Sequence, residues 1–150
     1  MRILFGLGSN LGDRNFYLDA AIKDLIVELF LIDDKRSNIF ANPAMLLPNS
    51  PPEWNCEFLN IAFSADIDLE KFSPQKILEI IKKIEKKFDR NHAYKWAPRE
   101  IDIDILAIGD LKIALGEELI VPHPGLFKRD FFIKTAMEIE GEWMNKLREV

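Results

Sequence analysis

Apolar side chains recur every three or four residues in two stretches of the sequence, residues 18–29 and 77–88. This spacing is typical of amphipathic helices that bury one face. Asp13 or Asn15 is suited to cap the first helix, and Ser73 followed by Pro74 marks the start of the second. The pattern therefore predicts two helices, and a third is expected over residues 128–139.

Shorter apolar or alternating runs predict strands over residues 3–7, 36–40, 58–65 and 101–108. The elements follow the order strand–helix–strand twice, with a C-terminal extension. This order favours an α+β fold of the split βαβ, or ferredoxin-like, type, in which helices cover one face of an antiparallel sheet. We expect the opposite face to stay open for ligands.

Two long segments interrupt the pattern, the proline-rich residues 41–55 and the polar, aromatic-bearing residues 89–99. Loops of this length inside a compact domain are often functional. Both are expected to lie beside a binding site.

Composition narrows the class of protein. The chain has 150 residues, of which 48% are hydrophobic, and this length predicts a single domain over residues 1–150. Apolar runs are too short for a membrane span, and no signal peptide is recognisable. One cysteine is compatible with the cytoplasm, and a net charge of −5 argues against nucleic-acid binding as the main role. With only two histidines, a zinc site of several Cys and His ligands is not easily assembled.

Two aspartates, Asp102 and Asp104, interrupt an otherwise apolar strand. Residues two apart on a strand point to the same side, so the two carboxylates repel unless a cation lies near them. Magnesium accepts one or two carboxylates together with substrate phosphates. An exposed strand face with ordinary alternation is the alternative interpretation.

Cationic side chains cluster around this strand in the sequence, and guanidinium groups match phosphate geometry. These side chains are Arg90, Lys95, Arg99 and Arg129. His92 and His123 are further possible phosphate donors, although His123, between two prolines, is equally suited to a turn. Taken singly, each cation is also explained as ordinary surface charge.

The segment "GLGSNLG" fits neither a Rossmann fingerprint nor a P-loop, and a tight turn explains most of it. Small residues such as Gly8 also let a ligand approach the backbone. Phe58 and Asn60 share one side of their strand and suit a flat heterocycle, with Phe131 as a second aromatic. Ordinary packing is the alternative for these residues.

Four segments together resemble the 6-hydroxymethyl-7,8-dihydropterin pyrophosphokinase family. They are "GLGSNLGDR", "FLNIA", "IEKKFDRNHAYKWAPREIDIDIL" and "VPHPGLFKRDF". The resemblance covers nearly the whole chain in order. It implies a ferredoxin-like fold and an enzyme that uses two magnesium ions to transfer pyrophosphate from ATP to the pterin hydroxymethyl group, releasing AMP.

The resemblance also implies roles for individual residues. Asp102 and Asp104 would bind the two magnesium ions. The triphosphate and catalytic set would be Arg90, Lys95, Arg99, His123 and Arg129, with Trp96 on a mobile catalytic loop. The pterin would lie between Phe58 and Phe131, with Asn60 at its edge and Gly8 close by. The backbone near Asn42, Pro43 and Met45 would complete its pocket. The adenine site would hold Leu78 and Ile105, with Glu85 nearby. Fusion to another folate-pathway enzyme is a further expectation.

A noncatalytic ligand-sensing or RNA-binding module on the same fold is the rival hypothesis, because fold does not determine function. An RNA-binding module favours a basic, aromatic sheet face. The paired aspartates and the acidic chain argue against it.

Overall fold

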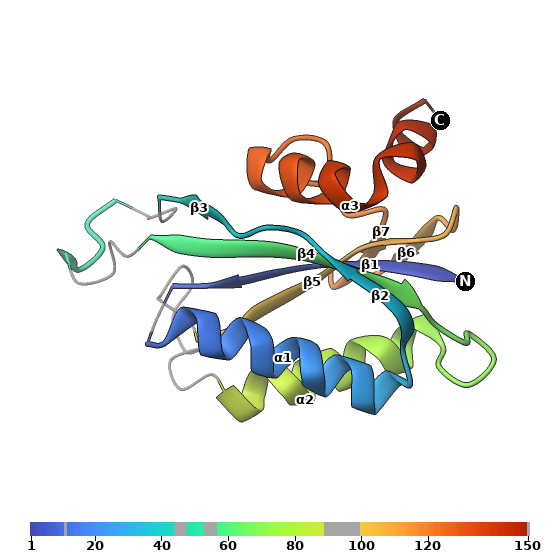
Figure 1. Cartoon of the computed structure of the whole chain (residues 1–150), viewed down its shortest axis with the longest axis horizontal. Coiled ribbons are helices and arrows are strands. Elements are labelled where there is room, and N and C mark those ends of the chain that lie inside the picture. The colour runs from blue at the N-terminus through green and yellow to red at the C-terminus, as the bar shows by residue number, and fades with distance from the viewer. Residues whose placement is uncertain (11, 44–47, 53–56, 89–99, 150) are drawn as a thin grey trace.

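The computed structural model describes the chain except residues 11, 44–47, 53–56, 89–99 and 150. An antiparallel sheet lies between two layers of helix (Figure 1). The strands are β1 (Arg2–Ser9), β2 (Ile32–Arg36), β3 (Phe40–Asn42), β4 (Phe58–Asp66), β5 (Asp102–Ile108), β6 (Ile113–Leu115) and β7 (Leu119–Val121). The helices are α1 (Arg14–Leu29), α2 (Pro74–Phe88) and α3 (Asp130–Arg148). The predicted α+β class with an antiparallel sheet is confirmed.

The main sheet has the strand order β2-β4-β1-β5, and β3 pairs with β4 as well. Every pairing in it is antiparallel. Strands β6 and β7 form a separate two-stranded sheet. The order places β1 and β4 in the middle, so the first strand of the chain lies next to β5.

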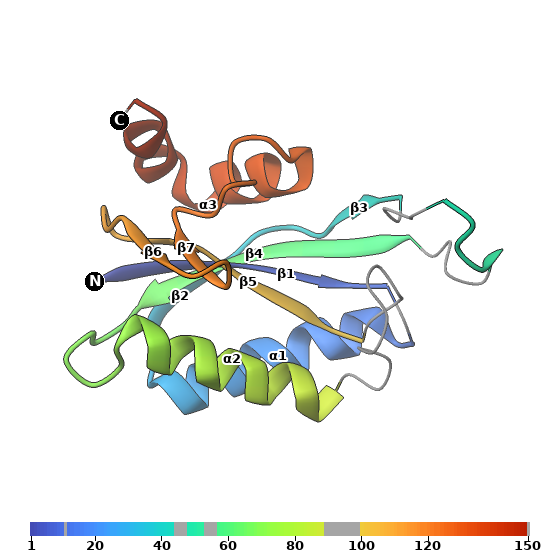
Figure 2. The same cartoon turned by 180° about the vertical axis from the view of Figure 1, so that it is seen from behind.

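Helices α1 and α2 cover one face of the sheet, as predicted (Figure 2). Their apolar stripes pack against Phe5, Phe63 and Ile103 of the three neighbouring strands. The Asp13 carboxylate accepts a hydrogen bond from the Phe16 N–H, and the Ser73 hydroxyl accepts one from the Lys76 N–H. Both predicted helix starts are therefore confirmed, with Asp13 rather than Asn15 as the first cap.

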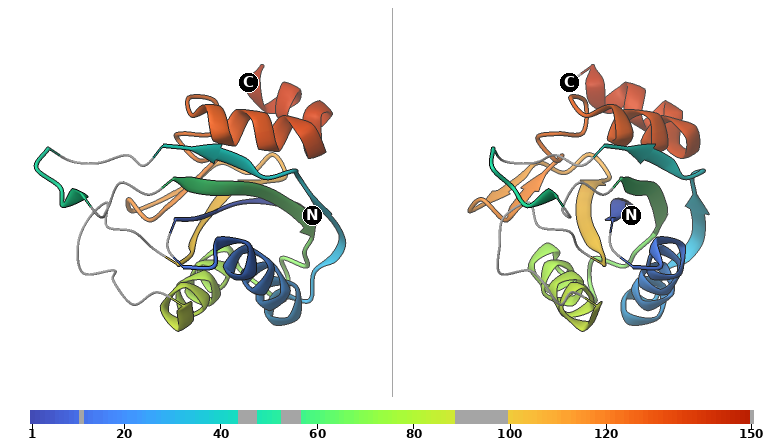
Figure 3. Two further views of the ribbon diagram at one scale, coloured as in Figure 1. Left: turned by 60° about the vertical axis from the view of Figure 1, so that its left-hand side comes forward. Right: turned by 90° about the vertical axis from the view of Figure 1, so that its left-hand side faces the viewer.

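The opposite face is not wholly open, so that part of the prediction is wrong. Helix α3 packs on it over Leu4, Ala62 and Leu106, which are all fully buried (Figure 3). A β-bulge explains this apolar surface: Leu4 pairs with Ala107 but Phe5 pairs with Ile105. The extra residue leaves Leu106 and Ala107 in the same cluster beneath α3.

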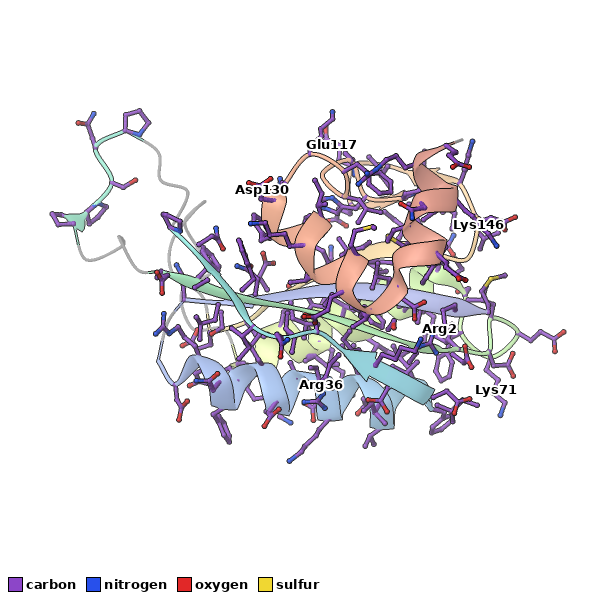
Figure 4. The ribbon with its side chains drawn as sticks, turned by 45° about the horizontal axis from the view of Figure 1, so that its top comes forward. Arg2, Arg36, Lys71, Glu117, Asp130 and Lys146 are labelled. Carbon is purple, nitrogen blue, oxygen red and sulfur yellow. The ribbon has the colours of Figure 1, made fainter. Side chains whose placement is uncertain are left out.

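Helix α3 runs to Arg148, beyond the predicted end at residue 139. It bends at Glu140, whose backbone is non-helical. The Glu140 carboxylate accepts hydrogen bonds from Arg2 and Ser64 at 3.1 and 2.9 Å, which tie the bend to the sheet (Figure 4, where Arg2 is labelled). Although α3 is 19 residues long, neither it nor any other helix among the described residues is long and apolar enough to cross a membrane.

The single strand predicted over residues 36–40 is wrong, because β2 ends at Arg36 and β3 begins at Phe40. Ser37 causes the break. Its hydroxyl accepts a hydrogen bond from the Ala62 N–H, while its own N–H donates to the Ala62 carbonyl, both at 2.9 Å. The Ser37 hydroxyl thus takes the place of a backbone carbonyl as the partner of the Ala62 N–H, and the hydrogen-bond ladder along β4 is interrupted there.

Candidate active site

One row of residues crosses four strands on the face that also carries α3. Asp102 of β5 lies opposite Gly8 of β1, Gly8 lies opposite Asn60 of β4, and Asn60 lies opposite Phe40 of β3. The register therefore brings together residues that the sequence separates by up to 94 positions, counted from Gly8 to Asp102.

Gly8 lies directly beside Phe58 and Asn60. A β-carbon added at Gly8 would lie 3.2 Å from Asn60 Oδ1 and 3.4 Å from Phe58 Cδ1. The missing side chain leaves this stretch of β1 flat between an aromatic ring and an amide. The predicted grouping of these three residues is present in the structure.

The Asn60 amide is held by β3. Its Nδ2 donates to the Phe40 carbonyl at 3.1 Å and to Asn42 Oδ1. The Asn42 Nδ2 in turn donates to the Pro43 carbonyl at 3.0 Å. Sequence reasoning expected only the backbone near Asn42 to contribute here and missed its side chain and the Phe40 carbonyl, because strand pairing is not visible in one sequence.

Asp102 and Asp104 are both half-buried on β5, and His123 approaches Asp104 from the turn after β7. His123 Nε2 lies 3.7 Å from Asp104 Oδ1. His123 Nδ1 accepts a hydrogen bond from the Gly125 N–H at 2.9 Å, so the ring proton of the neutral form lies on Nε2. Burial, together with the nearby Arg129 charge, lowers the pKa of His123, and Asp102 partly opposes this.

The side chains of Arg129 and His123 both contact the aromatic ring of Phe132. The Arg129 guanidinium carbon lies 5.5 Å from the centre of the Phe132 ring, and the His123 ring meets the same ring edge-on at 5.3 Å. Phe131 lies beside it, with ring centres 4.6 Å apart. The sequence interpretation named Phe131 but missed Phe132, although Phe132 and Ala136 follow the four-residue spacing of a buried helix face.

Glu85 approaches β5 from α2. Its Oε2 accepts a hydrogen bond from the Ile103 N–H at 2.8 Å. Burial, reinforced by the charge of Asp102, raises the pKa of Glu85 to about 8. By contrast, Leu78 and Ile105, which the family resemblance assigns to adenine, lie in or against the core beneath the sheet.

The donor set fits magnesium rather than a metal held by protein alone. Within the described ranges, no three Asp, Glu, His or Cys side chains are grouped closely enough to hold a metal ion. Magnesium needs only one or two carboxylates when phosphates complete its shell, and Asp102 and Asp104 are two carboxylates that would fit this need. Six candidate site residues lie outside the described residues: Met45, Arg90, His92, Lys95, Trp96 and Arg99.

Paired carboxylates beside a histidine and an arginine are typical of enzymes that act on metal-bound phosphates. Residues 4–141 match the 7,8-dihydro-6-hydroxymethylpterin-pyrophosphokinase (HPPK) family, and the chain belongs to this family. It is therefore an enzyme of the pyrophosphokinase class.

Individual relatives agree with this assignment. The chain is 43% identical over 138 residues to the 2-amino-4-hydroxy-6-hydroxymethyldihydropteridine pyrophosphokinase of Aquifex aeolicus, covering 92% of this chain and 79% of that protein. It is 34% identical to the protein of the same name from Bacillus subtilis, covering 89% of this chain and 74% of that protein. The Folate synthesis bifunctional protein of Chlamydia muridarum is 37% identical over 91% of this chain, which spans only 30% of that longer protein.

Proposed function

We propose that this protein transfers pyrophosphate from ATP to the hydroxymethyl group of 6-hydroxymethyl-7,8-dihydropterin, giving AMP and the pterin diphosphate in folate biosynthesis. The observation that carries the proposal is the row from Asp102 through Gly8 to Asn60. It brings the carboxylate of Asp102 next to Gly8 and Asn60 on one sheet face, which supports a site where metal-bound phosphate and a flat heterocycle would bind side by side. Family membership supports the same reaction.

At the phosphate end, Asp102 and Asp104 are the residues that would hold two magnesium ions. Bound magnesium would neutralise the triphosphate and align its bridging oxygens. The lowered pKa of His123 favours its neutral form, which carries its proton on Nε2, on the side of Asp104. His123 and Arg129 would donate hydrogen bonds to phosphate oxygens, held in place by Phe132.

At the heterocycle end, Gly8, Phe58 and Asn60 would bind the pterin. The flat backbone at Gly8 lets the ring approach β1, and Phe58 offers an aromatic face. Phe131 in the first turn of α3 would cover the other side of the pterin ring. Asp130, the first residue of that helix, is labelled in Figure 4. Phosphoryl transfer requires mainly positioning and charge neutralisation, and this arrangement would supply both.

Wider features of the proposal follow the family. The order of β1, α1, β2–β3, β4, α2 and β5, with β1 between β4 and β5, supports a ferredoxin-like fold in a single domain of residues 1–150. Adenine would lie near Leu78, Ile105 and Glu85. The Chlamydia and Lactococcus lactis relatives are named as bifunctional proteins, which supports fusion or close association with another folate-pathway enzyme. We also propose a cytoplasmic location, with which the single cysteine is compatible.

Nucleotide products test the proposal directly. ATP incubated with the protein, magnesium and 6-hydroxymethyl-7,8-dihydropterin is expected to give AMP and pterin diphosphate in equal amounts, and neither product when magnesium is chelated. Release of ADP, or AMP formation that does not depend on the pterin, would reject it. A ligand-sensing module would bind the same molecules without turnover.

A further inference from the structure

The orientation of the Asn60 side-chain amide is fixed before any ligand binds. A primary amide has two N–H donors on nitrogen and one carbonyl oxygen that accepts. Asn60 Nδ2 gives one hydrogen bond to the Phe40 carbonyl at 3.1 Å and one to Asn42 Oδ1. Both donors are therefore used within the protein, and Asn60 Oδ1 is the end turned toward Gly8.

The two acceptors are themselves held in place. Phe40 pairs with Asn60 across the strands, and the Lys134 ammonium lies 4.9 Å from the centre of the Phe40 ring. Asn42 Nδ2 donates to the Pro43 carbonyl, so Asn42 can offer only its oxygen to Asn60. If Asn42 turned over, two N–H groups would face each other and the Pro43 contact would be lost.

We propose that the Asn42 side chain is a positioning residue that sets ligand preference by fixing Asn60 with its carbonyl oxygen toward the ligand. This inference rests on the proposed function, because the ligand it concerns is the pterin. The row then presents a hydrogen-bond acceptor beside Gly8, which favours a ring edge that carries N–H donors. The pyrimidine end of a pterin carries an amino group and a ring N–H, so its chemistry matches.

Without Asn42 the amide of Asn60 is free to rotate by half a turn. Its NH₂ group then faces the ligand in part of the population. In those molecules the N–H donors of Asn60 point at the N–H donors of the pterin edge. Binding is reduced because the competent orientation is only fractionally populated. A site that binds a polar ligand group through a hydrogen bond loses much of its affinity when that hydrogen bond cannot form.

The test is a double-mutant cycle read by calorimetric binding of 6-hydroxymethyl-7,8-dihydropterin and, separately, of a nonhydrolysable ATP analogue with magnesium. Asn42→Leu keeps the size of the side chain and removes its polar atoms. We expect it to weaken pterin binding about tenfold while changing ATP-analogue binding less than about twofold. Asn42→Asp retains an oxygen toward Asn60 and should stay within about threefold of wild type. Because Asn42 acts through Asn60, Asn42→Leu should have no further effect in an Asn60→Leu background.

Asn38→Ala is the matched control. Asn38 lies in the same region and donates to Glu138 from its backbone and its side chain, so this change loosens the contact between α3 and the β2–β3 connection without touching the amide pair. An equal loss of pterin affinity in Asn38→Ala, additive effects in the double mutant, or wild-type affinity in Asn42→Leu would each overturn the inference. Failure of the wild-type protein to bind the pterin would instead reject the proposed function, and this inference with it.

Discussion

The face of the sheet beneath α3 has two ends that differ in chemistry. At one end, Leu4, Ala62 and Leu106 are fully buried under the helix, and Arg2 binds Glu140 and Asp66 around the bend. At the other end the same strands carry glycine, amide and carboxylate groups: Gly8, Asn60, Asp102 and Asp104. The first end packs against α3 of the same protein, whereas the side chains of the second end are suited to metal, phosphate and a flat ring. We therefore propose that one sheet face serves stability and function in separate regions.

The largest expected effect is at the carboxylates. Asp102→Ala and Asp104→Ala should each lower turnover at least about 100-fold, because each removes charge compensation at the transferring phosphates. Thermal stability should be kept or raised, since removing one of two nearby carboxylates relieves their repulsion. Asp110→Ala, in the exposed turn after β5, is the control. Near-wild-type turnover of either variant at saturating magnesium would contradict the metal assignment.

The opposite end should respond in stability rather than in chemistry. Leu4→Ala leaves a cavity beneath α3 and should cost about 2–5 kcal/mol in the free energy of unfolding, measured with urea. Turnover per folded molecule, assayed well below the melting temperature, should stay within about twofold of wild type. Leu115→Ala changes an exposed leucine and should have little effect on either quantity. A specific loss of turnover in Leu4→Ala would mean that the two ends are not separable.

In the metal-free protein, Glu85 is expected to make the free energy of unfolding depend on pH. Burial, with the charge of Asp102, raises the pKa of Glu85 from 4.5 to about 8. Between these values the folded state holds a proton that the unfolded state has lost, so stability falls as pH rises through this window. Glu85→Gln removes the contribution of this group to the slope of the unfolding free energy against pH. For one group that slope is about 1.4 kcal/mol per pH unit.

Urea unfolding at several pH values with a chelator measures this slope. Glu79→Gln, an exposed glutamate on the same helix, is the control and should unfold with the wild-type slope. If Glu85→Gln also keeps the wild-type slope between pH 5 and 7, the raised pKa is wrong.

The smallest expected effect compares two glycines of β1. Gly8→Ala places a methyl group between Asn60 and Phe58 and should raise the KM for the pterin about fivefold to tenfold with little change in the KM for ATP. Gly6→Ala places its β-carbon 2.9 Å from Phe132 and should mainly destabilise the fold, by about 1–3 kcal/mol. Steady-state kinetics and urea unfolding separate the two results. Equal kinetic effects would contradict the boundary between the two ends.

The sequence predicted those features that depend on local pattern. Periodicity identified α1 and α2, and Asp13 and Ser73 indicated where they start. The alternation of Asp102 and Asp104 with isoleucines identified the strand and the side on which both carboxylates lie.

Features that depend on register or long-range packing were not predictable from one sequence. The bulge beside Leu106 turns an extra apolar side chain toward α3, and nothing in the local pattern marks it. Likewise, the Asn42–Asn60 contact requires β3 and β4 to pair. The break at Ser37 is not visible in the sequence, so residues 36–40 were predicted as one strand and the start of β3 was missed. The expectation of an open sheet face failed because α3 extends over the apolar end.

The central claim is that ligands occupy only the carboxylate end of this face. Backbone amide NMR shifts, recorded before and after adding magnesium, a nonhydrolysable ATP analogue and 6-hydroxymethyl-7,8-dihydropterin, test it most directly. The account predicts large shifts for Gly8, Asn60, Asp102 and His123, and small shifts for Leu4 and Glu140. Large shifts centred on Leu4 and Glu140, with Gly8 and Asp102 unchanged, would contradict it.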